Sequence, residues 1–185
     1  MKIKMLIGVL ILAVLATMSV AWTTNNNSLP AEVNVEGVVM TYAWSMDNLD
    51  KTTWLSVFSD NLESYIVYKG DTAEPLLMIP VPSVPPGHPL YGLTPKEQLA
   101  YLCDMMIFQR IVVAQSFLSN IVIDVEGVKA TGKDYFSHWE IAKTDIAHWS
   151  FQEGKHWYKL AKEEATWKIT KFEGRIYRTE ARDIP

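Results

Sequence analysis

The sequence predicts an α+β fold, with helices packed on one face of a curved antiparallel sheet around a central pocket. Before residue 111, apolar residues recur at helical spacing, as in Val38, Val39, Tyr42, Met46 and Leu49. From Ile111 onwards the pattern changes to four long strands in meander order. Helical segments followed by a run of strands are typical of an α+β domain. Such a curved sheet leaves a cone whose mouth is a usual place for a ligand.

Length and composition limit the class of protein. The chain has 185 residues, of which 49% are hydrophobic, enough for one domain with a sizeable core. Its formal net charge of −4 argues against a nucleic-acid partner, which requires a basic face. The lone cysteine, Cys103, cannot form an internal disulfide and is expected to be a small buried hydrophobe.

Residues 1–21 have the features of a secretory signal peptide. Lys2 and Lys4 give a positive start, residues 5–15 are apolar, and small residues precede a cleavage site at Trp22. The sequence therefore predicts a protein that is secreted or periplasmic once its leader is removed. The alternative is an uncleaved membrane anchor, although the apolar run is shorter than the roughly 20 residues that a membrane span needs.

The chain after the leader is predicted to begin with a spacer and a helix. Residues 22–30 are predicted to be a flexible spacer, and residues 31–185 a single domain. The first helix should run from about Pro30 to Asn48, because proline is favoured in the first turn of a helix. Residues 62–68 are rich in aromatic and β-branched types and predict a strand.

Residues 72–93 contain five prolines between Pro80 and Pro89 and predict a loop with polyproline character. The segment is too apolar for a bare linker. It could lie across the domain as a lid, provide a contact surface, or be an ordered surface insertion.

The second half of the chain predicts one helix and then four strands. Thr94, Pro95 and Glu97 form a helix start with a capping box, and the helix should continue towards Arg110. The four strands are predicted at residues 112–126, 128–142, 148–161 and 166–179.

Two parts of the sequence resemble a known family. The first consists of Tyr42, Trp44, Asp47, Asp50 and the run Phe58-Ser59-Asp60-Asn61. It is similar to the opening of the SnoaL-like and scytalone dehydratase-like branch of the nuclear transport factor 2 (NTF2)-like superfamily. The second, Trp167-Lys168-Ile169, resembles the start of the last strand in that family. The resemblance implies the same α+β cone and dehydratase-type chemistry.

Two carboxylates lie near the end of the first predicted helix. Asp47 lies one position from the buried stripe, where it could face a cavity as a base or as an orienting group. Asp50 follows three residues later and is predicted to contact the substrate. The alternative is that both carboxylates are solvated or cap the following turn, because acidic residues are mostly exposed unless they are paired.

The strand predicted at 112–126 departs from the family pattern. The resemblance would place a catalytic histidine where this chain has Ser116. A serine can donate a hydrogen bond but cannot act as a base near neutral pH. Ser116 is therefore predicted only to contact the substrate, and the family's dehydratase chemistry is in doubt.

Two histidines lie on predicted strands. Asp134, Phe136 and His138 share one face of their strand. A histidine beside an inward carboxylate would be held in one tautomer and could shuttle a proton, so His138 is a catalytic candidate. The alternative is a half-buried His138 bonded to a neighbouring strand. His156 shares a face with Tyr158 and either contacts a substrate in the cavity or packs there.

Three tyrosines complete the predicted site. Tyr65 and Tyr68 lie on opposite faces of their strand, and one of them could polarise a substrate carbonyl or hold a water. The alternative is that both pack as ordinary strand aromatics. Tyr42 lies on the buried stripe of the first helix and is predicted to contact the substrate.

Three functions remain open from the sequence. The first is a cofactor-independent lyase or isomerase acting on a small cyclic or phenolic molecule, with Asp47, His138 and a tyrosine as its catalytic groups. The second is a non-catalytic domain that binds a small apolar or aromatic ligand. The third is an assembly module that forms a homo-oligomer through the outer sheet face, where Trp139 and Trp157 could supply apolar area. No cofactor is expected, and the histidine spacing does not predict a metal site.

Overall fold

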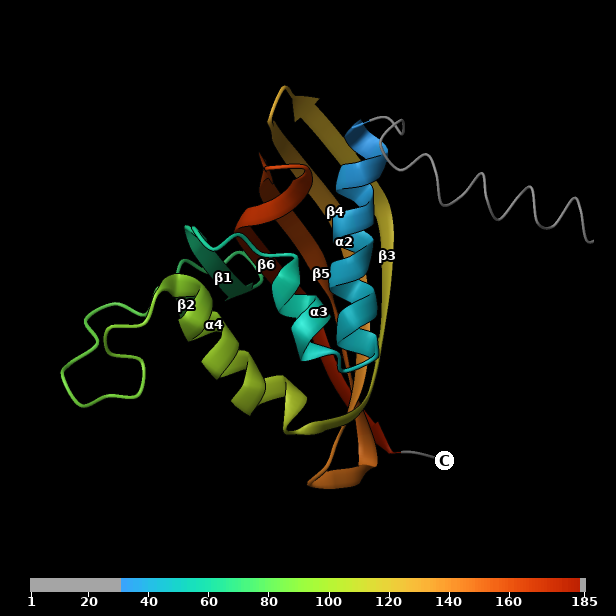
Figure 1. Cartoon of the computed structure of the whole chain (residues 1–185). Coiled ribbons are helices and arrows are strands. Elements are labelled where there is room, and N and C mark those ends of the chain that lie inside the picture. The colour runs from blue at the N-terminus through green and yellow to red at the C-terminus, as the bar shows by residue number, and fades with distance from the viewer. Residues whose placement is uncertain (1–30, 184–185) are drawn as a thin grey trace, which may run out of the picture.

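The computed structural model of the protein describes residues 31–183, so the predicted leader and spacer lie outside the described residues. In chain order the elements are α2 (Ala31–Asp47), α3 (Lys51–Ser56), β1 (Ser64–Lys69), β2 (Pro75–Ile79), α4 (Pro95–Cys103), the π-helix η1 (Asp104–Phe108), β3 (Ile111–Glu126), β4 (Lys129–Ala142), β5 (Asp145–Glu163) and β6 (Thr166–Asp183). The strands form one sheet, and α2, α3 and α4 lie on the same side of it (Figure 1). The predicted α+β fold is confirmed.

The sheet has the strand order β2-β1-β6-β5-β4-β3. The four long strands pair antiparallel in meander order, as predicted. However, β1 pairs with β6 in parallel, so the sheet is mixed rather than purely antiparallel. This pairing joins segments about 100 residues apart in the chain, and local sequence pattern carries no signal for it. The edge strands β2 and β3 do not pair with each other, so the sheet stays open.

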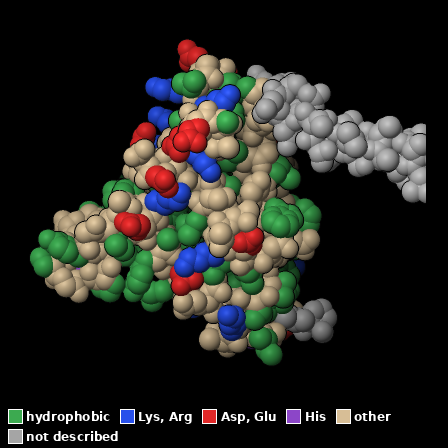
Figure 2. All heavy atoms as spheres, in the orientation of Figure 1, with side chains coloured by type: hydrophobic (Ala, Val, Ile, Leu, Met, Phe, Trp, Pro, Cys, Tyr) green, Lys and Arg blue, Asp and Glu red, His purple; other side chains and the backbone are tan. Residues whose placement is uncertain are grey.

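The proline-rich segment differs from the prediction of an uninterrupted loop. Residues 75–79 form the edge strand β2, with Pro75 at its first position and Pro80 directly after its end. Both positions spare the proline from donating to the ladder, which is why an edge strand tolerates them. The remaining residues, 80–93, project away from the sheet (Figure 1). Figure 2 shows hydrophobic side chains on this projection, and Tyr91 is 56% exposed.

Helix α2 packs its predicted stripe into the core. Val35 and Val39 are fully buried, Tyr42 is 6% exposed, and Met46 is half-buried. Trp54 of α3 and Phe58, which lies just after the end of α3, are also fully buried. The inner face of the sheet supplies the other side of this core, through residues such as Ile169 and Phe172.

Helix α4 begins at the predicted capping box. Thr94 accepts a hydrogen bond from the backbone N–H of Glu97, and Glu97 accepts one from the backbone N–H of Thr94. The sequence predicts a helix that continues towards Arg110, but the last turn, η1, is a π-helix. Cys103, at the end of α4, is a free and buried thiol, as predicted. Within residues 31–183, no helix is long and apolar enough to cross a membrane.

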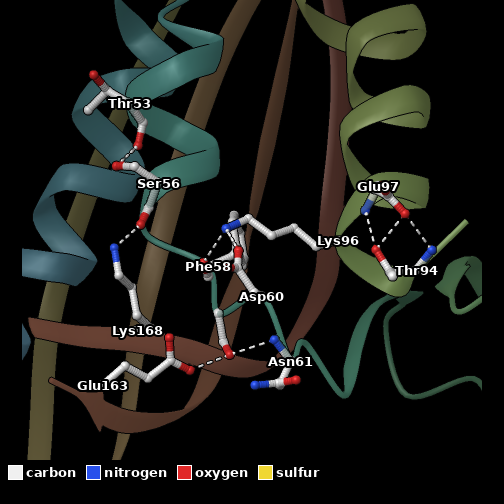
Figure 3. A network of polar contacts seen from close by, with 11 residues as sticks. Thr53, Ser56, Phe58, Asp60, Asn61, Thr94, Lys96, Glu97, Glu163 and Lys168 are labelled. Atoms are coloured by element: carbon white, nitrogen blue, oxygen red, sulfur yellow. Dashed lines mark hydrogen bonds and ion pairs between the residues drawn. The ribbon is translucent and has the colours of Figure 1, made fainter.

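The Phe58–Asn61 run is tied to distant parts of the chain (Figure 3). Lys96 of α4 donates to the carbonyl of Phe58 at 2.8 Å and to Asp60 at 2.7 Å. The buried hydroxyl of Ser59 donates to Glu163 at the end of β5. These bonds fix the segment between α3 and β1, and with it the start of the strand that carries Tyr65.

Candidate functional site

The inner face of the sheet brings the predicted site residues into register. Along each strand, alternate side chains point inward, and the pairing of neighbouring strands arranges them in rows. Three rows matter for the site: Ser116–His138–Gln152, Leu118–Phe136–Gly154–Ile176 and Asp134–His156–Gly174. The residues that the sequence groups on one face of each strand, Asp134 with His138 and His156 with Tyr158, therefore lie on the inner face of the sheet.

A cavity of about 290 Å³ lies between this face and the helical layer. Its lining is mostly apolar and includes Met46 of α2, Cys103 of α4 and Met106 of η1. The polar side chains that line it are Tyr42, Tyr65, Ser116, His138, Glu140, Gln152 and His156. Five of the predicted site residues are among them. The cavity is thus an apolar space with a few convergent polar groups, as ligand sites usually are.

The outer polar group of the cavity consists of Ser116, His138 and Glu140. The hydroxyl of Ser116 lies 2.9 Å from Nδ1 of His138, and Nε2 of His138 lies 3.3 Å from Oε2 of Glu140. The hydroxyl of Ser150 donates to the other oxygen of Glu140 at 3.2 Å. The hydrogen bond from His138 holds the pKa of Glu140 below its usual value against the effect of burial. An ionised Glu140 accepts a hydrogen bond from Nε2–H of His138, which leaves the lone pair of Nδ1 to accept one from the hydroxyl of Ser116.

The inner polar group of the cavity consists of Asp134, His156 and Tyr158. Oδ1 of Asp134 lies 3.0 Å from Nδ1 of His156, and the hydroxyl of Tyr158 donates to Oδ2 of Asp134 at 2.6 Å. That hydroxyl also lies 3.0 Å from Nδ1 of His156. The side chain of Asp134 is fully buried. Burial, together with the neighbouring Asp134 carboxyl, raises the pKa of Tyr158 well above the usual value. Tyr158 therefore stays protonated and acts as a donor.

These two groups correct one detail of the sequence analysis. The sequence places His138 four residues after the inward carboxylate Asp134 on the same face, and so predicts that Asp134 holds it. The structure pairs Asp134 with His156 on the neighbouring strand and pairs His138 with Glu140. Residues four apart on a strand lie about 13 Å apart, whereas cross-strand neighbours are within about 5 Å. The cross-strand partner is therefore the one within reach.

Two tyrosines stand beside the inner group. The hydroxyls of Tyr42 and Tyr65 lie 3.3 Å apart, and burial raises the pKa of both above the usual value. The ring of Tyr65 stacks on Phe172 at a centroid distance of 4.5 Å. Tyr65 is thus the inward tyrosine of β1. Tyr68 lies on the opposite face, where the guanidinium of Arg175 sits 4.6 Å from its ring centre, and it does not line the cavity.

The two predicted carboxylates of the α2–α3 region do not line the cavity. Asp50 caps α3, accepting from the backbone N–H of Thr53 at 3.0 Å and from its hydroxyl at 2.6 Å. Its geometry is that of the capping alternative, and a contact with the substrate stays a prediction. Asp47 is the last residue of α2 and is half-buried. Its Oδ1 is buried without a hydrogen-bond partner among residues 31–183, so its catalytic role stays a prediction.

Sequence reasoning missed two polar residues of the site. Glu140 follows His138 by two residues on the same face of β4, and Gln152 lies on β5 directly opposite His138. The period-2 pattern around His138 could have indicated Glu140. Gln152 could not be placed without the register of β5.

The sequence comparison matches residues 27–173 to the SnoaL-like domain. The match covers most of the chain. This chain belongs to the SnoaL-like family. No curated protein matches its sequence.

Solved structures share the fold of this SnoaL-like chain. One is a candidate scytalone dehydratase from Novosphingobium aromaticivorans, with a TM-score of 0.60 and 15% identity over 82% of this chain and 87% of that one. Another is a hexachlorocyclohexane dehydrochlorinase, LinA, from Novosphingobium barchaimii, with a TM-score of 0.60 and 11% identity over 83% and 93%. A third is an NTF2-like superfamily protein from Salmonella enterica, with a TM-score of 0.61 and 14% identity over 80% and 91%. At these identities the likeness establishes the NTF2-like fold alone.

The hydrogen bond between His138 and Glu140 predicts a pH-dependent contribution to stability. Because the pKa of Glu140 is lowered in the folded state, its stabilising effect is present above the unfolded value, about 4.5, and is lost as the pH falls through the lower folded value. We expect Glu140→Gln to be less stable than wild type at pH 7, and the difference to shrink below pH 4.5. Urea unfolding of both proteins at several pH values measures this. A difference that grows on acidification would contradict it.

Proposed function

We propose that this SnoaL-like domain is a cofactor-independent lyase or isomerase that removes a proton from carbon in a small cyclic or phenolic substrate. The observation that carries the proposal is His138, held between Ser116 and Glu140 on the wall of an apolar cavity. The names of two structural neighbours, a candidate scytalone dehydratase and a dehydrochlorinase, agree with elimination chemistry on rings.

His138 is the base in this proposal. Glu140 holds the proton on Nε2, so the lone pair of Nδ1 is the basic site. A substrate reaches Nδ1 by displacing the hydroxyl of Ser116, which can turn to another rotamer about its Cα–Cβ bond. When Nδ1 takes the proton, the ring becomes an imidazolium, and the negative charge of Glu140 stabilises it. A base placed in this way contributes about 10²- to 10⁴-fold to the rate.

Hydrogen–deuterium exchange at carbon tests the base even when the reaction product is unidentified. The protein is incubated in D₂O with cyclic ketones, lactones, quinones and phenols that stabilise it in a thermal-shift screen, and NMR follows loss of the C–H signals. We expect His138→Gln to slow exchange by about 10²-fold or more. His148→Gln is the matched control, because His148 is an exposed histidine paired with Asp145 and Asp183 outside the cavity.

The same assay separates the competing functions. Exchange that is equally fast in His138→Gln would overturn the proposed base, and Asp47→Asn then shows whether Asp47 acts instead. A ligand that stabilises the protein but exchanges no proton would indicate a carrier.

An assembly function is the second candidate, and the outer sheet face favours it. Phe117 is 50% exposed and Trp139 is 37% exposed, with their ring centres 5.4 Å apart. Trp139 also contacts Trp149 and Phe151, so the aromatic area is continuous over three strands. Analytical ultracentrifugation of wild type and Trp139→Ser tests this. Pairing through this face predicts a dimer that the substitution weakens.

We also propose that the protein acts outside the cytoplasm, as the signal-like sequence of residues 1–21 suggests. Intact-mass measurement of the protein from culture medium or periplasm tests this. A chain that begins at Trp22 supports it, and a full-length chain in the cytoplasm contradicts it.

A further inference from the structure

The inner polar group is not used by the base proposed above. Asp134 has a fully buried side chain, and His156 is 8% exposed and lines the cavity. The ring of His156 is clamped flat on Phe136, with a centroid distance of 4.1 Å and an interplanar angle of 4°. The positions of the protons on this carboxylate and imidazole determine which hydrogen bonds the pair can offer to a molecule in the cavity.

The contacts of the group fix where those protons lie. Tyr158 has a single hydroxyl proton, which it donates to Oδ2 of Asp134. The remaining contact, between Oδ1 of Asp134 and Nδ1 of His156, therefore needs one proton of its own. That proton sits on Nδ1 if Asp134 is ionised, and on Asp134 if the carboxyl is neutral.

The net charge of the Asp134–His156 pair determines whether Nε2 of His156 carries a proton. Among residues 31–183, no lysine or arginine forms an ion pair with Asp134. An ionised Asp134 therefore needs a cationic His156 to avoid a buried, uncompensated charge, which would cost several kcal/mol. A neutral Asp134 donates to Nδ1, and the neutral imidazole then carries its own proton on Nε2. Both arrangements without net charge place a proton on Nε2 of His156.

Nε2 has no partner among the described residues, so its proton is free for a molecule in the cavity. The Tyr42–Tyr65 pair supplies a second donor. Its two hydroxyls share one hydrogen bond, which leaves the second hydroxyl proton unused. Raised pKa values keep both tyrosines protonated at neutral pH. The inner end of the cavity therefore offers donors, whereas the outer end, with Glu140 and Nδ1 of His138, offers acceptors.

We propose that the inner end is a subsite for an acceptor oxygen, in which Nε2–H of His156 donates to the carbonyl or enolate oxygen of the ligand. This inference rests on the proposed function and names its substrate class as cyclic carbonyl compounds, rather than rings without an acceptor oxygen. In the reaction, the C–H bond next to the carbonyl breaks and its proton goes to His138. The electron pair of that bond forms a double bond to the carbonyl carbon, and the π pair of the C=O bond moves onto the oxygen. The Nε2–H bond to that oxygen strengthens as negative charge develops there.

The protonation state can be measured directly in the wild-type protein. Long-range ¹H–¹⁵N NMR of histidine-labelled protein at pH 7 reports whether each ring nitrogen of His156 carries a proton. We expect a protonated Nε2, either as an imidazolium or as the Nε2–H tautomer. An unprotonated Nε2 would overturn the proposal, and this measurement needs no variant that could fail to fold.

Binding of a matched ligand pair tests the subsite itself. The probes are 1-indanone and indane, which share a ring system and differ in the carbonyl oxygen. We expect wild type to bind 1-indanone about tenfold more tightly than indane, as one net hydrogen bond would give. In the double variant Asp134→Asn/His156→Phe, chosen so that no carboxylate loses its partner, we expect the ratio to fall to about one.

His138→Gln separates this inference from the proposed function. The substitution lies in the outer polar group, so we expect it to slow proton exchange by about 10²-fold or more and to leave the indanone-to-indane ratio unchanged. Equal affinity for both probes in wild type, or an unchanged ratio in the double variant, would overturn the subsite even if His138 proves to be the base. A normal ratio without any proton exchange would support the subsite and overturn the enzyme.

Discussion

Replacing Gly154 by alanine is expected to destabilise the fold by about 3 kcal/mol or more. A Cβ at this position would lie 2.0 Å from the carbonyl oxygen of Arg175 and 2.6 Å from Cε1 of Phe136. The first clash is with the backbone of the neighbouring strand, at the irregular pairing between Glu153 and Gly154. Backbone held in a ladder cannot yield without breaking its hydrogen bonds, so the strain cannot be relieved by a change of rotamer.

The second clash connects Gly154 to the cavity. The missing side chain lets the ring of Phe136 lie against Gly154 and stack on His156. A methyl group would push Phe136 into the cavity or away from His156. We therefore expect any folded Gly154→Ala protein also to lose ligand affinity.

Urea unfolding of Gly154→Ala beside Gly37→Ala measures the effect. Gly37 lies inside α2, and a Cβ there meets nothing within 4 Å. Alanine in a helix interior is favoured over glycine by about 0.5–1 kcal/mol, so this control should stabilise the protein. If Gly154→Ala unfolds within about 1 kcal/mol of wild type, the close packing of β5, β6 and Phe136 described above is wrong.

Local patterns in the sequence predict the elements well. The helix at 30–48, the capping box at Thr94 and the four long strands all depend on residues close together in the chain. The same holds for the residues that share a face of β4 or of β5, because side chains alternate with a period of two. Local spacing therefore groups His138 with Asp134, and His156 with Tyr158, on one face of each strand, but it does not show that this face is the inner one.

Contacts between strands are not predictable in the same way. Which residue of β5 lies opposite Asp134 depends on the register of β4 against β5, and a shift of one residue would remove His156 from that position. Register in this sheet is modified by bulges, as between Ser119 and Val122. No short-range signal specifies these shifts.

The ends of helices are also uncertain from sequence. Asp47 lies next to the buried stripe by spacing, but α2 ends at this residue, and Met46 rather than Asp47 lines the cavity.

The parallel pairing of β1 with β6 also cannot be predicted from local sequence pattern. It brings Tyr65 beside Phe172 and so decides which tyrosine of β1 faces inward, a question that alternation alone leaves open.

Replacing Asp134 by valine is expected to cost about 3–5 kcal/mol of stability, the second large effect. The change removes the Asp134 carboxyl that contacts both the hydroxyl of Tyr158 and Nδ1 of His156, and leaves these buried groups with only their mutual contact at 3.0 Å. Asp124→Val is the matched control, because Asp124 is an exposed aspartate in the adjacent strand β3, and we expect it to change stability by less than about 0.5 kcal/mol. Urea unfolding of both variants beside wild type measures the two effects.

A triple variant shows whether the inner group serves stability or ligand binding. In Asp134→Val/His156→Phe/Tyr158→Phe, no polar atom of the group is left unpaired, so we expect most of the stability lost in the single variant to return. The triple variant should nevertheless bind 1-indanone no better than indane. Such a result would mean that apolar side chains can replace the inner polar group without loss of stability, but not without loss of ligand recognition. The inner polar group would then serve ligand binding rather than folding. A triple variant as unstable as Asp134→Val would instead assign the three residues a structural role.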